Sequence, residues 1–106
     1  MELIKKKGTI YQKDSPTKSV LTTREVEYIS LVALGYKNWM IAKVLFVSNS
    51  TVKKTLENIS RKLNARDRAN AVAIAFIHNL INAETLTQII KSHDLIMAPT
   101  NYQYYC

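Results

Sequence analysis

The chain contains very little cysteine and glycine, and each shortage excludes a kind of site. Cys106, the last residue, is the only cysteine, so no disulfide within the chain and no cysteine-based metal site can form. Two glycines in 106 residues leave no room for a glycine-rich phosphate loop. The lack of disulfide chemistry fits a protein of the reducing cytoplasm.

Long hydrophobic runs and catalytic groupings are also absent from the sequence. No run of about 18 apolar residues could span a membrane, and the first residues, MELIKKK, lack the apolar stretch of a secretory signal. His78 and His93 have no metal-ligand spacing and are predicted to lie at helix C-termini. We therefore expect a cytoplasmic protein that is not an enzyme, has no metal, cofactor or small-molecule ligand, and does not contact a membrane.

Acidic residues are scarce relative to basic ones. The formal net charge is +7, and every Lys and Arg except Lys91 precedes Ala69. Lys and Arg that neutralise phosphates release condensed counterions, which drives binding to nucleic acid regardless of sequence. The charge distribution therefore favours a nucleic-acid partner, with anionic membranes and acidic proteins as the alternatives.

The hydrophobic pattern predicts one small all-α domain. Helical periodicity is dense from about Val20 to Ile81. The predicted organisation is a flexible basic arm (1–19), a helical domain (20–81), a segment with an additional amphipathic helix (82–98) and a tail (99–106). The arm carries a lysine run and the linker-like KDSPTKS, typical of a solvated tail, with a DNA-binding arm as the alternative.

Capping residues predict where the helices begin and end. Thr22 and Glu25 form a capping box, and Gly35 is placed to end that first helix. Asn38, Ser48 and Asp67 are the N-cap candidates of the next three helices, and Asn79 is the stop signal of the last of them. The predicted helices therefore cover about 22–34, 39–45, 48–63, 68–78 and 83–93.

The segment 48–63 has two chemically different faces as a helix. Its apolar residues fall on one narrow stripe, formed by Val52, Leu56, Ile59 and Leu63. The opposite side carries polar and charged residues, namely Ser50, Lys54, Glu57 and Arg61, flanked by Lys53 and Lys62. Such a helix of roughly 22 Å is narrow enough to enter the major groove of DNA. We interpret it as a DNA-recognition helix.

The helix 68–78 is apolar on nearly all sides. Its alternating alanines keep it slim, while Val72, Ile74, Phe76 and Ile77 spread around it. An apolar circumference requires two covered faces. One face must meet the core; the other is covered either by the helix 83–93 folding back or by a second copy of the protein. We expect a homodimer in which the helix 83–93 extends the interface onto the other protomer.

An ordered set of short motifs resembles the DNA-binding domain of the LuxR/GerE/NarL family of bacterial transcription regulators. The set spans about residues 21–81. Its members are L-T-x-R-E at 21–25, Gly35 before Asn38, Ile41-Ala42, S-x-x-T-V-K at 48–53, Asn58-Ile59, Lys62-Leu63, and Arg66 and Arg68 before Ala71-Val72. The resemblance implies a four-helix bundle whose second and third helices form a helix-turn-helix and whose fourth helix pairs two protomers.

The resemblance also implies a division of DNA contacts. Base edges would be met by Lys53, Lys54 and Glu57, and phosphates by the residues Ser48, Asn49, Ser50, Thr51 and Lys62, with Arg61 beside them. Glu57 either accepts a hydrogen bond from a cytosine amino group or pairs with Lys53 or Arg61, which we favour. Trp39 departs from the family pattern and is either partly packed or a donor to phosphate.

These observations predict a sequence-specific regulator of transcription that binds double-stranded DNA as a dimer, without a sensor domain in this chain. The protein would then be associated with the nucleoid, with RNA polymerase as a further partner. One alternative is an interaction module that dimerises with a larger regulator without reading DNA, which would not need the basic helix face. Two others are a fragment of such a regulator and a sigma-factor-like promoter reader.

Overall fold

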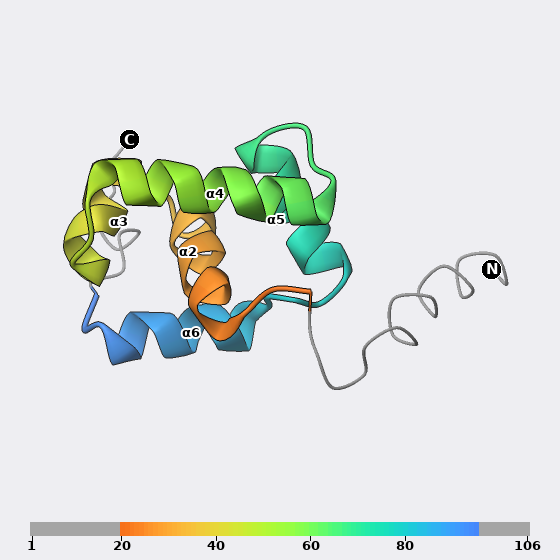
Figure 1. Cartoon of the computed structure of the whole chain (residues 1–106). Helices are drawn as coiled ribbons and strands as arrows, with labels where there is room; N and C mark the ends of the chain where they lie inside the picture. The colour runs from red at the N-terminus through yellow and green to blue at the C-terminus, as the bar shows by residue number, and fades with distance from the viewer. Residues whose placement is uncertain (1–19, 96–106) are drawn as a thin grey trace, which may run out of the picture.

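The computed structural model describes residues 20–95, so the predicted arm and tail lie outside the described residues. Within this part of the chain the regular structure is entirely helical, as predicted, with no strand. The helices, shown in Figure 1, are α2 (Thr23–Ala33), α3 (Asn38–Leu45), α4 (Asn49–Leu63), α5 (Arg68–Ile77) and α6 (Ala83–Ser92). The division of the chain into a domain over 20–81 and an added segment over 82–98 remains our proposal.

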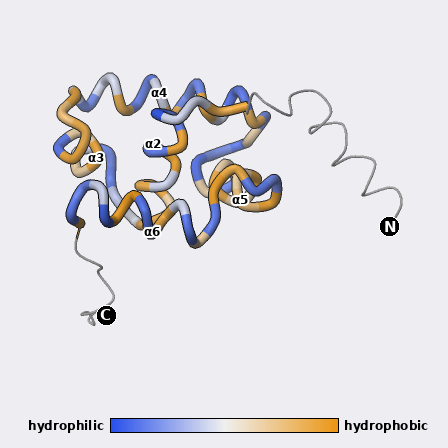
Figure 2. Tube along the Cα trace, turned by 90° about the horizontal axis from the view of Figure 1, so that it is seen from below, coloured by the Kyte–Doolittle hydropathy of each residue, from blue (hydrophilic) through white to orange (hydrophobic). Residues whose placement is uncertain are grey.

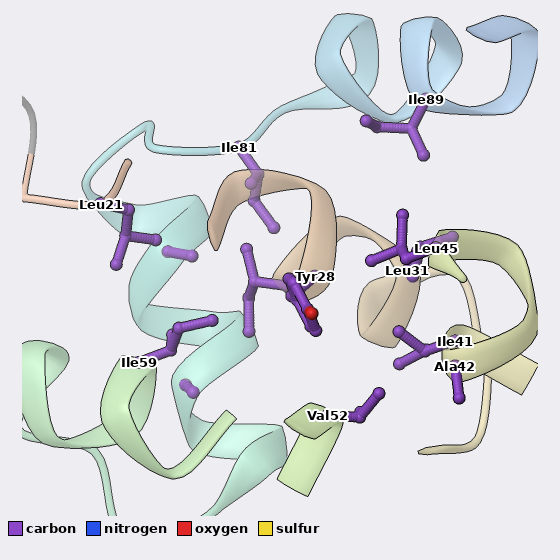
Figure 3. Packing of buried hydrophobic residues seen from close by; sticks show 13 residues of the cluster. Leu21, Tyr28, Leu31, Ile41, Ala42, Leu45, Val52, Ile59, Ile81 and Ile89 are labelled. Carbon is purple, nitrogen blue, oxygen red and sulfur yellow. The ribbon is translucent and has the colours of Figure 1, made fainter. Parts of the chain in front are cut away.

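Helix α2 is the centre of the bundle. Among the described helices it is the one that contacts all the others. Figure 1 shows α4 on one side of α2 and α6 on the opposite side, with α3 and α5 at the two ends. The side chains between them form one continuous core, drawn in Figure 3, of Leu21, Tyr28, Ile29, Leu31, Ile41, Ala42, Leu45, Val52, Ile59, Ala71, Ala75, Ile81 and Ile89. The surface of α4 that faces away from α2 is thus turned to solvent.

Side-chain caps begin most of the helices where the sequence predicts them. Thr22 Oγ1 accepts from the Glu25 amide at 3.0 Å, and Glu25 Oε1 accepts from the Thr22 amide at 2.9 Å. Ser48 and Asp67 accept from the third residue of their helices at 3.0 and 2.8 Å. These bonds satisfy amides that would otherwise lack partners. The capping box and both further caps are therefore confirmed.

The predicted N-cap role of Asn38 is wrong. Lys37 occupies the cap position of α3 and makes no side-chain cap, while Asn38 is already helical. The Asn38 side chain is engaged elsewhere, because its Oδ1 accepts a hydrogen bond from Arg68 Nη1 at 2.9 Å. Arg68 Nη2 also reaches the carbonyl of Tyr36 at 3.4 Å. These two hydrogen bonds join the start of α5 to the first residue of α3 and to the loop before it.

Each described helix is followed by a residue in the left-handed backbone region. Gly35 has φ 95°, and the other four are not glycines: Phe46, Asn64, Asn79 and Asp94, with φ between 54° and 57°. The stop signals predicted at Gly35 and Asn79 are confirmed. Asn and Asp tolerate this conformation better than other residues because their short side chains bond locally, so Phe46 is the exception among the four.

Helix α6 packs on α2 and not on α5. Ile89 points into the core beside Leu31 and Leu45 (Figure 3) and is 8% exposed. The alternative in which α6 folds back over α5 of the same chain is therefore wrong, whereas the extension of the interface onto a second protomer stays a prediction. Ile89 is the buried residue of the apolar face of α6, whereas Leu86 and Ile90 are half-buried. Ile81, at the turn before α6, is also buried. The outer face of α5 is left uncovered.

Candidate nucleic-acid interface

Helix α4 is held in the bundle by the apolar stripe that the sequence predicts. Val52 and Ile59 are fully buried, and Leu56 and Leu63 are partly buried against the core. Helices α2, α3 and α5 all contact α4. Burying several such side chains contributes about 1.5 to 3 kcal/mol each. The orientation of the opposite, polar face is thus fixed by packing.

All of the predicted DNA-contact residues are exposed on α4 or at its start: Ser48, Asn49, Ser50, Thr51, Lys53, Lys54, Glu57, Arg61 and Lys62. The structure brings them onto one helix, but their side chains are not equally free. Lys53, Lys54 and Glu57 have no hydrogen-bond partner within the described part of the chain. Residues at both ends of α4 do have such partners. The middle of the exposed face is therefore the part best able to reach a ligand.

The first turn of α4 presents a group of hydroxyls beside free helix amides. Ser48 Oγ lies 3.0 Å from Thr51 Oγ1 and 3.4 Å from Ser50 Oγ. There is no acidic residue in this turn. A helix N-terminus carries partial positive charge and amides that point outward, so it suits a phosphate. The predicted phosphate contacts at this end have the appropriate chemistry.

The last turn of α4 carries two cations that bind partners within the chain. Arg61 Nη1 donates to Asn58 Oδ1 at 2.7 Å. Lys62 Nζ donates to Glu25 Oε1 and Oε2 at 2.8 and 3.0 Å. The contact between Lys62 and Glu25 could not be predicted from the sequence, because it joins residues on different helices. Lys62 thus anchors α4 to α2, in addition to the phosphate contact that we propose for it.

The contacts of the Glu25 carboxylate with Lys62 and Thr22 change its pKa. Partial burial raises its pKa, but hydrogen bonds from the Lys62 ammonium and the Thr22 amide, and the charge of Lys62, outweigh burial, so the pKa is lowered overall. Glu25 therefore stays ionised at neutral pH. It serves as the acceptor for both the α2 cap and the end of α4.

The ion pair that we favoured for Glu57, with Lys53 or Arg61, is absent from the described part of the chain. Among the described residues the ion pairs of Lys and Arg are Arg24 with Glu27 and Lys62 with Glu25, and His93 Nε2 lies 3.7 Å from Glu27 Oε2. Arg61 turns to Asn58 instead, which is closer along the helix. The carboxylate of Glu57 is left facing solvent as a hydrogen-bond acceptor, which keeps the cytosine contact as its proposed role.

Residues outside α4 that sequence reasoning missed also shape this face. Arg24 Nη2 donates to the Leu45 carbonyl at the end of α3, at 3.2 Å, and Arg24 Nη1 pairs with Glu27 at 2.9 Å. Phe46, in the turn between α3 and α4, is 92% exposed. An exposed aromatic in a turn gives no periodic signal, and a contact between helices has no fixed spacing.

No helix among residues 20–95 is both long and apolar enough to cross a membrane. No group of three or more His, Cys, Asp or Glu side chains in that part of the chain is arranged to hold a metal ion.

Three packed helices that present a basic, exposed third helix after a tight turn define a helix-turn-helix DNA-binding domain. Residues 19–75 match the family model described as bacterial regulatory proteins, luxR family. The chain therefore belongs to the luxR family of bacterial regulatory proteins, and the predicted resemblance is confirmed.

Curated relatives support the same assignment. The chain is similar to the response regulator protein VraR of Staphylococcus aureus (strain NCTC 8325 / PS 47), with 41% identity over 78 residues. It is equally similar to VraR of Staphylococcus epidermidis (strain ATCC 35984). The match covers 74% of this chain and 34% of each relative, so the chain spans about a third of their length.

Proposed function

We propose that the protein binds double-stranded DNA sequence-specifically by inserting α4 into the major groove, and thereby regulates transcription. The observation that carries this proposal is the exposed middle of α4. There Lys53, Lys54 and Glu57 have no hydrogen-bond or ion-pair partner among the described residues, while the opposite side of the helix is buried. Lys is suited to acceptors on guanine and Glu to the amino group of cytosine.

Phosphate contacts would hold the helix in register. The hydroxyls and amides of Ser48, Asn49, Ser50 and Thr51 lie at its N-terminal end, and Arg61 and Lys62 lie at its C-terminal end. Phosphate contacts orient a protein on the duplex, whereas base contacts read the sequence. The proposed activity is binding, without a chemical step, in the cytoplasm where the nucleoid lies, with RNA polymerase as a further proposed partner.

We also propose that the protein binds DNA as a homodimer through α5. Exposed apolar residues follow one face of this helix at helical spacing: Ala69, Ala73, Phe76 and Ile77. Phe76 is 42% and Ile77 is 73% exposed. In Figure 2 this helix is coloured hydrophobic over most of its length. A two-fold axis at this face would place two recognition helices about 34 Å apart, one turn of DNA.

The test is a binding titration on a duplex selected from a random library with the full chain. With about 6 to 10 phosphate contacts per dimer, we expect the affinity to fall by roughly 10³ to 10⁵ between about 50 and 200 mM salt. A footprint on the selected duplex should cover two half-sites. An affinity that does not change with salt, or that is equal for selected and random duplexes, would refute the proposed function.

A further inference from the structure

Asn58 is an exposed polar residue of α4 outside the proposed set of DNA contacts. It lies one helical turn after Lys54 and one turn before Arg61, and the side chains of both neighbours are also exposed. At about 100° per residue, these three residues fall within about 60° of one another around the helix axis. Asn58 therefore belongs to the strip of α4 that would enter the groove with Lys54.

The spacing of residues along this strip suits a helix that lies along the major groove. In homeodomains, the base-contacting residues of the reading helix lie three, four and seven positions after the first one. The same spacing occurs in α4 at Lys54, Glu57, Asn58 and Arg61. Side chains three and four positions apart share one face of a helix, so a helix that presents Lys54 and Glu57 to bases also presents Asn58.

The side-chain amide of Asn58 is half engaged within the chain. Its oxygen, Oδ1, accepts a hydrogen bond from Arg61 Nη1 at 2.7 Å, and a bond from a charged donor is stronger than one between neutral groups. No hydrogen bond within residues 20–95 involves its nitrogen, Nδ2. Because Oδ1 and Nδ2 lie on opposite sides of a planar amide, Arg61 holds the two N–H donors of Nδ2 turned away from itself.

The engaged oxygen limits which base Asn58 is able to read. A free asparagine pairs with adenine through both atoms, since Nδ2 donates to N7 and Oδ1 accepts from N6. In this chain Oδ1 already accepts from Arg61, so the amide offers donors alone. Guanine presents two acceptors in the major groove, N7 and O6. Its edge therefore complements Nδ2, whereas the N6 donor of adenine would lack an acceptor.

We propose that Asn58 reads a guanine in the major groove through Nδ2, and that Arg61 is the positioning residue that sets this preference. Arg61 binds Oδ1 through Nη1, and its remaining donors, Nε and Nη2, are left for the phosphate contact proposed for this residue. A phosphate bound there would hold the guanidinium, and through it the amide, in place. This inference rests on the proposed function and adds one base contact to each half-site.

The experiment is a selection from random duplexes by the full wild-type chain and by the variants Asn58→Ala and Arg61→Ala. The wild type should prefer guanine at one position of each half-site where Asn58→Ala does not. There the ratio of affinities for guanine and adenine should fall about tenfold in Asn58→Ala, while the preferences at other positions remain. Arg61→Ala frees Oδ1 for N6, so its preference at that same position should change from guanine to adenine.

Two further variants serve as controls. Arg61→Lys keeps a charged donor three positions after Asn58, so it should retain the guanine preference. Asn49→Ala makes the same substitution at the start of α4, where a phosphate contact is proposed, so it should weaken binding to all duplexes alike and leave every base preference unchanged. All three positions are exposed, so the circular dichroism of each variant should match that of the wild type.

The outcomes distinguish failure of this inference from failure of the proposed function. If Asn58→Ala keeps every base preference of the wild type, Asn58 reads no base. If Arg61→Ala and the wild type prefer the same base at that position, Arg61 does not set the preference. Either result overturns the inference and leaves the proposed contacts of Lys53 and Lys54 in place. If the wild-type chain selects no duplex at all, the proposed function fails and this inference fails with it.

Discussion

The ammonium of Lys62 in the last turn of α4 lies 2.8 Å from Oε1 of Glu25 in the first turn of α2. The same carboxylate accepts the Thr22 amide that begins α2. One side chain therefore completes a helix cap and anchors the far end of the recognition helix. The position of α4 relative to the core is linked to the charge of Glu25.

Glu25→Gln should reveal this link through pH. Glutamine keeps the capping geometry but removes the charge, so the variant should lose about 0.5 to 1 kcal/mol at neutral pH, as for a partly exposed ion pair. The folded-state pKa of Glu25 is lowered from 4.5, so its contribution is present above pH 4.5 and is lost as the pH falls through the lower folded value. Urea unfolding at several pH values measures the difference.

The control for this prediction is Glu57→Gln, which removes a carboxylate that has no ion-pair partner among the described residues. Its free energy of unfolding at neutral pH should equal that of the wild type. If the Glu25→Gln difference persists unchanged in acid, well below pH 4.5, the ion pair is not its source.

Replacement of the exposed lysines of α4 should distinguish the proposed base contacts of Lys53 and Lys54 from the contact of Lys62 with Glu25. Lys53→Ala or Lys54→Ala should cost roughly 1 to 3 kcal/mol on the selected site and relax the sequence preference. Lys62→Ala should weaken binding to all duplexes alike and should also lower stability, since Glu25 loses its partner. Competition titrations with selected and random duplexes measure this; equal losses on both duplexes for all three variants would contradict the division.

Ile77→Lys should abolish self-association without unfolding the protomer. Ile77 is 73% exposed in the single chain, so a lysine there disturbs no core packing, but it would place a charge in an α5 interface. Sedimentation equilibrium of the full chain should show a dimer for the wild type and a monomer for the variant. Gln88→Lys on the exposed face of α6 is the control, and a dimer in all three proteins would exclude α5 as the interface.

Ser30→Ala should stabilise the domain. Ser30 is completely buried in α2, and no described residue hydrogen-bonds to its hydroxyl. An unsatisfied buried polar group costs about 1 to 3 kcal/mol, so its removal should raise the free energy of unfolding by about 1 kcal/mol. The midpoint of urea unfolding measures the change. A lower midpoint would show that the hydroxyl has a partner, such as a buried water.

The parts of the fold that local chemistry determines could be predicted from the sequence. The caps at Thr22, Ser48 and Asp67 and the buried stripe of α4 depend on residues three or four positions apart, and that spacing is visible in the chain. Contacts between helices have no such spacing and could not be predicted from the sequence. The Asn38 cap was mispredicted because Arg68, 30 residues away, binds the side chain that would have made it.

The candidate site divides in the same way. Exposure of Lys53, Lys54 and Glu57 follows from helical periodicity and was predicted. The role of Lys62 as an anchor, the position of α6 on α2 and the exposure of Phe46 depend on how whole helices pack, which periodicity does not determine. A pattern shows which face of a helix is buried but not which helix covers it.

Both ends of α4 are fixed within the chain, by the Ser48 hydroxyl at the start and by left-handed Asn64 at the end. The recognition helix is thus complete before DNA arrives, and association should require little ordering of the backbone, unlike segments that fold as they bind. We expect the far-ultraviolet circular dichroism of residues 20–95 to be the same in the free and bound states. The enthalpy and heat capacity of binding would then contain no contribution from the formation of α4.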